Sequence, residues 1–167
     1  YLLEAIPRVI AAHPEAVFVL VGAGPERTAI EASIAEAGLH SHVRLLGERS
    51  DIEELSCAAD LFVFPTTFEG SPFALLEAMA SGCACLATDA GADGEVLADG
   101  AGIVLSTQGV TTQLRTLLPV LRDQPVLTHE LGQRARQRVL ERYTLSRNID
   151  ALEQLYADLM KTSTVAA

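Results

Sequence analysis

Five short apolar runs, each about the length of a β-strand, alternate along this chain with longer segments of helical pattern. Their Val, Leu and Phe residues follow one another without a polar face, as in strands that are buried on both sides of a parallel sheet. Connections of the strand, helix, strand type form right-handed crossovers, so we predict an α/β protein with a doubly wound parallel sheet of five strands. The predicted strands are residues 16–22, 43–47, 60–65, 84–88 and 102–106.

Residues 1–167 are predicted to form a single domain, since a chain of this length can bury one core. Hydrophobic residues make up 49% of the chain and charged residues 20%, a composition that argues against disorder. Only helical patterns follow the last predicted strand, and Pro119 and Pro125 are expected to kink or divide them. Residues 125–161 are therefore predicted to be C-terminal helices, the last of them capped by Ser146.

The net charge of −10, from 22 acidic and 12 basic side chains, argues against binding to nucleic acid or to an anionic membrane surface. No apolar run approaches the roughly 20 residues of a transmembrane helix. Cys57, Cys83 and Cys85 form no Cys-x-x-Cys pair and have no histidine nearby to complete a metal site, so they are interpreted as reduced thiols in the core. Together with the absence of a signal-peptide pattern, they predict a cytoplasmic location.

Capping signals mark several predicted helix ends. Asp51, with Glu54 three residues on, has the pattern of a capping box for a helix that begins at residue 52. Pro25 suits the first position of another helix, and Gly38 suits the residue after its end. Gly82 is predicted to end a third helix, the one that begins near residue 72.

Ligands of doubly wound sheets bind at the carboxyl ends of the strands, and candidate residues follow four of the predicted strands. These candidates are Gly22 and Gly24, Arg49 to Asp51, Thr66 to Phe73, and Asp89 to Glu95. The stretch GAGPER resembles the start of a dinucleotide-binding fingerprint, but Arg27 replaces its third glycine and Pro25 interrupts the spacing. A tight turn into a helix is the alternative interpretation, and both interpretations allow backbone amides to face a ligand.

The helix near residue 72 has the features of an anion site at its start. Ser71 is the predicted N-cap and Pro72 the predicted first helical residue. The amides of Phe73 and Ala74 would then lack partners within the helix and point toward a ligand, where the helix dipole also favours negative charge.

Two glutamates flank this helix start: Glu69 precedes it, and Glu77 follows Phe73 by four residues on the same helix face. Carboxylates accept hydrogen bonds from hydroxyl groups, so the pair suits a ligand with hydroxyls at both ends and phosphate between them. Both residues could instead be solvated surface charges. A general acid/base pair is less favoured, because both carboxylates would compete with the phosphate. The residues expected to pack against the sheet are Leu75, Leu76 and Met79.

The stretch EGSPFALLEAMASG, residues 69–82, resembles the Glu-x7-Glu motif of retaining glycosyltransferases with the GT-B fold, family 4, or glycosyl transferases group 1. Four further segments resemble the same family in the same order: FVLVGAGPER, VRLLGERSDIEELSCAADLFVFPT, CLATDAGADGEVLADG and RARQRVLERYTLSRNIDALEQLYADL. An ordered series over nearly the whole chain is far more specific than one motif. The resemblance implies the C-terminal, Rossmann-like half of a GT-B protein, which holds a nucleoside-diphosphate sugar. An N-terminal Rossmann-like domain of the same polypeptide would hold the acceptor.

The resemblance also implies roles for individual residues. Glu69 would be the catalytic residue that binds hydroxyls of the donor sugar, and Glu77 would bind the ribose hydroxyls. Arg49 and Ser50 would border the base. The other residues implied are Gly70, Ser71, Pro72, Phe73 and Ala74 for the sugar and diphosphate, and Gly22 and Gly24 for the nucleotide.

Two features depart from the family pattern. Pro72 stands where many relatives have glycine, although proline suits a first helical position. The family's first C-domain strand, with an Arg and a Lys that contact the diphosphate, should precede Tyr1. Because the sequence opens at Tyr1 in mid-helix and without a cap, we interpret it as an excised fragment. Cations from the preceding segment would explain how so acidic a chain serves a diphosphate, and we expect the fragment alone to bind donors poorly.

The predicted function is therefore donor binding in a retaining hexosyltransferase that needs neither metal nor cofactor. No Asp-x-Asp or histidine cluster indicates a metal site. The reaction implied is a front-face displacement in which the leaving phosphate helps to accept the proton of the acceptor. Three alternatives stay open: a nucleotide-sugar epimerase of the same fold, a non-catalytic nucleotide-binding or interaction module, and a dinucleotide-binding oxidoreductase domain. Peripheral membrane association through the N-terminal half also stays open.

Overall fold

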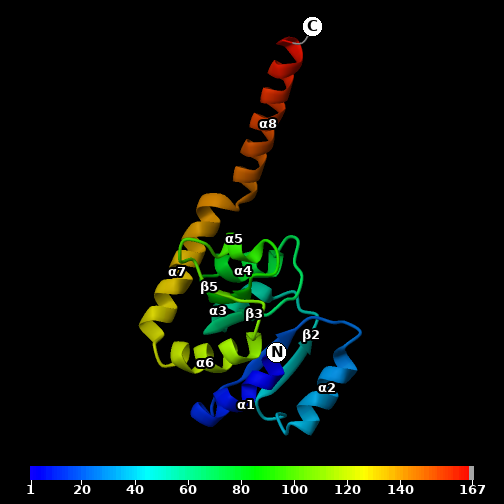
Figure 1. The fold of residues 1–167 in the computed structure, drawn as a ribbon, viewed down its shortest axis with the longest axis vertical. Helices are drawn as coiled ribbons and strands as arrows, with labels where there is room; N and C mark the ends of the chain where they lie inside the picture. The colour runs from blue at the N-terminus through cyan, green and yellow to red at the C-terminus, as the bar shows by residue number, and fades with distance from the viewer. Residues whose placement is uncertain (166–167) are drawn as a thin grey trace.

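The computed structural model describes residues 1–165, and Figure 1 shows a layered body from which the last helix projects. Strands and helices alternate as far as the fifth strand, as predicted, and only helices follow. The strands are β1 (Phe18–Val21), β2 (Val43–Gly47), β3 (Leu61–Phe64), β4 (Ala84–Thr88) and β5 (Ile103–Leu105). The helices are α1 (Leu2–Ala12), α2 (Arg27–Glu36), α3 (Ile52–Ala58), α4 (Phe73–Ala80), α5 (Asp93–Val96), α6 (Val110–Arg122), α7 (Pro125–Arg142) and α8 (Leu145–Val165).

The five strands run parallel, but hydrogen bonds join them into two sheets, β1–β2 and β3–β4–β5. The prediction of one continuous five-stranded sheet is therefore wrong within residues 1–165. The chain crosses from β2 to β3 by way of α3, and β1, β2, β3 and β5 each keep one edge that pairs with no described strand. Hydrophobic packing joins the two sheets instead, because Phe18 of β1 and Leu61 of β3 contact one cluster that includes Val9 of α1.

The core is centred on β4, in which every residue is buried. Alternate side chains of β4 enter different layers, as the two-residue period of a strand requires. Cys85 and Ala87 pack with residues of α4, α5 and α7, whereas Ala84 and Leu86 pack with residues of α1 and α6. A third cluster packs α1 and α2 on β1 and β2. Helices therefore cover both sides of the strands, which confirms the doubly wound α/β class.

The C-terminal region is helical, as predicted. Pro119 lies inside α6, and Pro125 is the first residue of α7. The predicted cap at Ser146 is wrong, because the amide of Arg147 donates to the hydroxyl oxygen of Thr144 at 3.3 Å, just before α8 begins. In Figure 1, α8 extends away from the layered body. Among the described residues, no helix combines the length and the apolar character needed to span a bilayer.

The three cysteines are free thiols, but only two lie in the core. Cys83 and Cys85 are buried, and burial raises the pKa of the Cys83 thiol to about 11 and also raises that of Cys85. Cys57 is exposed, so the prediction of a core thiol is wrong at this position. The reason is local, since α3 turns Ser56 rather than Cys57 toward the interior.

Candidate functional site

The loops that follow β1 and β2 are joined to each other directly. The amide of Gly22, directly after β1, donates to the carbonyl oxygen of Gly47, the last residue of β2, at 2.7 Å. Both glycines have positive φ, 121° and 69°, which few other residues adopt without strain. Gly24 is exposed in the turn that leads into α2. That helix begins at Arg27 rather than at Pro25, because the turn closes with a bond from the amide of Arg27 to the carbonyl oxygen of Gly24 at 3.3 Å.

Arg49 and Asp51 form an ion pair in the loop after β2. The Nε atom of Arg49 donates to Oδ1 of Asp51 at 2.7 Å, and a second guanidinium nitrogen bonds to Oδ2. This contact holds the pKa of the Asp51 carboxyl below its usual value. Asp51 does precede α3, but its carboxylate makes no capping bond, so the capping box predicted with Glu54 does not form. The two-point, charge-assisted pairing with arginine replaces it. Ser50 lies exposed between the paired residues.

The loop after β3 is held against the loop after β4 by backbone contacts at Glu69. The amide of Glu69 donates to the carbonyl oxygen of Ala90 at 2.8 Å, and Glu69 and Gly91 form a parallel bridge. Gly91 has a φ of 130°, and a Cβ atom there would collide with the carbonyl oxygen of Glu69. Only glycine therefore permits this close approach. The loop after β4 thus fixes the backbone of Glu69, while the residue itself is half-buried.

The start of α4 differs by one residue from the prediction. Pro72, which is buried, occupies the N-cap position with a ψ of 66°, and no side chain caps the helix, so the assignments of Ser71 as N-cap and Pro72 as first helical residue are wrong. The amide of Phe73 donates to the carbonyl oxygen of Ser71 at 2.9 Å and is not free, contrary to prediction. The amide of Ala74, in the first turn, still has no carbonyl four residues back within the helix.

Glu77 lies on the exposed face of α4 although its neighbours in sequence are apolar. Phe73 and Ala74 are exposed on the same helix. The buried residues of α4 are Leu75, Ala78 and Met79, with Leu76 half-buried beside them. The packing residues and Glu77 thus lie on different faces of the helix, and its carboxylate is free to meet a ligand or solvent. Gly70 and Ser71 are exposed in the loop just before this helix.

A buried aspartate, Asp93, lies next to these loops, and its environment was not apparent from the sequence. The hydroxyl of Thr66 donates to Oδ2 of Asp93 at 3.3 Å, and the hydroxyl of Thr88 donates to the carbonyl oxygen of Thr66. Burial raises the pKa of the Asp93 carboxyl, and the charges of Glu69 and Asp89 raise it further, against the opposing effect of the bond from Thr66. The sequence placed Asp93 among the candidates after β4 but gave no sign that it is buried.

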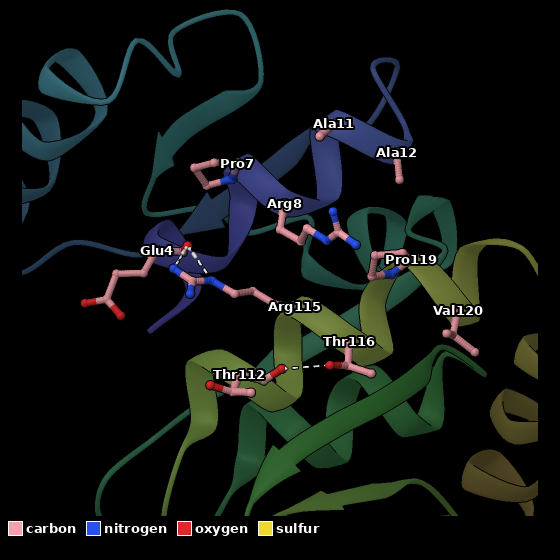
Figure 2. Close-up of a pocket in the computed structure, with 10 residues that line it drawn as sticks. All are labelled: Glu4, Pro7, Arg8, Ala11, Ala12, Thr112, Arg115, Thr116, Pro119 and Val120. Atoms are coloured by element: carbon pink, nitrogen blue, oxygen red, sulfur yellow. Dashed lines mark hydrogen bonds between the residues drawn. The ribbon is translucent and has the colours of Figure 1, made fainter.

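Two grooves lie away from these loops. A groove of about 810 Å³ runs between α1 and α6, where Arg115 donates to the backbone carbonyl oxygen of Glu4 at 2.9 Å and Arg8 lines the wall (Figure 2). A smaller one, of about 310 Å³, lies at the amino ends of β3 and β4 and is lined by Cys57, Cys83 and His129, among others. Neither groove is lined by a predicted site residue. Within residues 1–165, no group of three or more His, Cys, Asp or Glu side chains could hold a metal ion.

The structure thus brings the predicted residues together as two pairs of loops. Gly22 and Gly24 adjoin the Gly47 loop that carries Arg49, and Glu69 adjoins the Gly91 loop that carries Asp93. All four loops lie at the carboxyl ends of parallel strands. In Figure 1 the loops after β1 and β3 both lie toward the right of the view.

Comparisons with known proteins converge on one family. The family model for glycosyl transferases group 1 matches residues 1–123. N-acetyl-alpha-D-glucosaminyl L-malate synthase of Bacillus anthracis is 30% identical over 161 residues, which are 96% of this chain and 42% of that protein. The chain spans less than half the length of the curated relatives it matches.

Two solved structures extend this likeness. The C-terminal domain of LpcC, a glycosyl transferase group 1 family protein of Francisella tularensis, is 26% identical with a TM-score of 0.74 over 86% of this chain and 78% of that one. HepE of Anabaena in complex with UDP-glucose has a TM-score of 0.76 at 23% identity, over 94% of this chain and 46% of that one, and shows a shared fold.

Proposed function

Because the chain belongs to the glycosyl transferases group 1 family, we propose that it is the donor-binding half of a glycosyltransferase and holds a nucleoside-diphosphate sugar. The observation that carries the proposal is the placement of Glu69 and Glu77 on either side of the α4 start. Glu69 is anchored through its backbone to the Gly91 loop, while Glu77 is exposed on α4 beside Phe73. This layout offers two hydroxyl acceptors with a helix start between them.

Each part of the donor has a proposed partner. The carboxylate of Glu69 accepts hydrogen bonds from the sugar hydroxyls, and that of Glu77 accepts them from the ribose. The backbone from Gly70 to Ala74 borders the sugar and diphosphate, with the amide of Ala74 as a donor. The loops at Gly22, Gly24, Arg49 and Ser50 border the nucleotide. The UDP-glucose complex of HepE, which shares the fold, supports a donor of this class.

The diphosphate needs more positive charge than these loops supply. Arg49 is already paired with Asp51, and the chain as a whole carries a net charge of −10. We therefore place this chain as the C-terminal domain of a longer protein, in which a preceding strand with basic residues lies between β1 and β3. The likeness to the C-terminal domain of LpcC supports the place of this chain in a longer protein, and β1 and β3, like β2 and β5, each have an unpaired edge that could bond to a further strand. An N-terminal domain of the same polypeptide would hold the acceptor.

The proposed reaction is sugar transfer with retention of configuration, without metal. Glu69 holds the sugar so that its anomeric carbon faces the acceptor hydroxyl, and the bond to the leaving phosphate breaks on that same face. A phosphate oxygen takes the proton of the acceptor, so the protein need not supply a nucleophile. Membership of a transferase family favours this chemistry over the epimerase and oxidoreductase alternatives.

Amide shift mapping by NMR tests the proposal on this chain. UDP and UDP-glucose, added separately, should shift the amides of Gly22, Arg49, Glu69, Ala74 and Glu77, with weak affinity and no change on adding magnesium. GDP and GDP-mannose serve as second probes, since the base is not specified by these residues. Shifts confined to α7 and α8, or shifts that need magnesium, would contradict donor binding at the strand ends. A sugar-transfer assay on the longer protein separates transfer from binding alone.

A further inference from the structure

Asp93 is a completely buried carboxyl group that the proposed donor contacts do not use. It is the first residue of α5, directly after the loop that leaves β4, and its exposed fraction is 0%. A carboxylate in such a place must be paired or must give up its charge, because transfer of an ion from water to the interior is costly.

The contacts of Asp93 do not compensate a negative charge. Thr66 provides its one hydrogen bond, a long one of 3.3 Å to Oδ2, and Oδ1 is buried without any partner. The charged groups that face it, Glu69 from the loop after β3 and Asp89 from the loop after β4, are both acidic.

Arg138 of α7 contacts the same short helix, but its hydrogen bonds go to other groups. Arg138 donates to the carbonyl oxygens of Glu95 and Val96 at the opposite end of α5, and it pairs with Asp99. Among the described residues, the charged groups that act on Asp93 are acidic, and its burial beside them raises its pKa.

Asp93 is also tied to the loop that carries Glu69. Thr66 contacts Asp93 through its hydroxyl and Thr88 through its carbonyl oxygen, and Glu69 bridges to Gly91 three residues along the same loop. The two loops are thus fastened at Thr66 and at Glu69. A charge on Asp93 would act on both points, by repelling Glu69 and by altering the bond to Thr66.

We propose that Asp93 carries a proton in the working protein and is a positioning residue, which holds the loop from Thr66 to Glu69 in the arrangement that receives the donor sugar. Only the link to the donor sugar rests on the proposed donor-binding function; the proton on Asp93 and its hold on the loop do not. It assigns to Asp93 no contact with the donor, because its side chain is not accessible.

The first test needs no substitution and no ligand. Carbon-detected NMR of this chain, labelled at its aspartate carboxyl groups, should show Asp93 titrating above the ordinary range of an aspartate. The amides from Thr66 to Glu69 should shift in step with that titration. An ordinary aspartate titration of Asp93, or loop amides that do not follow it, would overturn the proposal whether or not a donor binds.

The second test uses variants and the donor pair UDP and UDP-glucose. Asp93→Asn keeps the shape and neutrality of the protonated acid, so it should keep UDP-glucose affinity within about twofold and remove the pH step from the loop amides. Asp93→Leu removes the acceptor for Thr66, and should weaken UDP-glucose about fivefold while leaving UDP nearly unchanged, because Glu69 serves the sugar. Asp60→Asn, a charge removal at the amino end of β3, is the matched control and should change neither affinity.

The outcomes are separable. If neither nucleotide binds the unmodified chain, donor binding fails as a function of this chain, and the carboxyl titration with its loop response still decides the role of Asp93. If both ligands bind but Asp93→Asn weakens UDP-glucose binding as much as Asp93→Leu does, a neutral side chain of the same shape does not support the loop and the proposal is wrong. If Asp93→Asn does not fold, the titration of the unmodified chain decides.

Discussion

At the scale of single residues, three carboxyl groups of the candidate site lie in three different environments. Glu77 is exposed, Glu69 is half-buried with its backbone bridged to Gly91, and Asp93 is completely buried. An exposed carboxylate can bind a hydroxyl at little cost, whereas a buried one must lose its charge or find a partner. The proposed binding and positioning roles therefore follow the exposure of the three carboxyl groups.

The two glutamates should respond differently to loss of charge. In the longer protein, Glu77→Gln should weaken free nucleoside diphosphate by about 1–2 kcal/mol, because an amide accepts less strongly from the ribose hydroxyls. Glu69→Gln should leave that affinity nearly intact and reduce turnover of the intact donor. Calorimetry with the nucleotide and kinetics with the donor measure the two effects. Equal losses of nucleotide affinity in both variants would return the glutamates to the status of surface charges.

Asp93 should make stability fall as pH rises. Its pKa is raised in the folded chain above the ordinary value of 3.8, so the folded state binds the proton more tightly than the unfolded state does. Its contribution is complete below about pH 4 and is lost as pH rises through the folded-state pKa. Asp93→Asn lacks this loss, so its stability relative to the unmodified chain should improve from pH 4 to pH 7.

Urea unfolding at a series of pH values measures this difference. Asp60→Asn again serves as the control, since it removes an exposed carboxyl group at the amino end of β3. A stability difference between Asp93→Asn and the unmodified chain that stays constant with pH would contradict the assignment.

At the scale of elements, contacts between loops rather than the pairing of strands determine where Glu69 and Asp93 lie. The backbone pairing of β3 with β4 ends at Phe64 and Ala87, and Glu69 and Gly91 form a separate bridge beyond it. This second contact exists because Gly91 lacks a Cβ atom and adopts a φ of 130°. The same loop leads into α4, and the buried Pro72 occupies the N-cap position just before the helix begins.

Gly91→Ala should therefore destabilise the chain and displace Glu69. Positive φ and the collision with the Glu69 carbonyl together should lower the free energy of unfolding by about 1–3 kcal/mol. Gly24→Ala, in open space and without positive φ, is the control for stability and should change it little. Denaturant unfolding gives the energies, and the amide shift of Glu69 reports its displacement. An unchanged Glu69 amide in a folded Gly91→Ala variant would refute the bridge as its anchor.

At the scale of the whole molecule, the chain is held together by packing more than by a continuous sheet. β4 is paired on both edges and buried on both faces, whereas β1 and β3 are each paired on one edge only. β1 also exposes apolar side chains, with Val19 and Val21 at 49 and 43%, and Val17 just before it is exposed at 54%. Unpaired edges and exposed apolar residues of this kind are typical of surfaces that another segment covers.

Hydrogen exchange should reveal this difference in pairing. Amides of β4 should be the best protected in this chain, and the outward amides of β1 and β3 should exchange much faster. In a longer protein that includes the preceding segment, β1 and β3 should gain protection while β4 changes little. NMR-detected exchange measures each strand separately. Equal protection of β1, β3 and β4 in this chain alone would contradict the proposed strand between the two sheets.

The sequence by itself determined the α/β class, the five strands and the order of the helices, because apolar period and helix-ending residues are local signals. It also placed Glu77 on a helix face opposite Leu75 and Met79, which the structure confirms. The roles of Glu69 and Glu77 toward a donor stay predictions. Only the tertiary structure decided the division into two sheets, the loss of the caps expected at Ser71 and Asp51, and the burial of Asp93. Each of these depends on residues distant in the sequence or on competition between partners, as when Arg49 takes the Asp51 carboxylate, and no local pattern encodes such a competition.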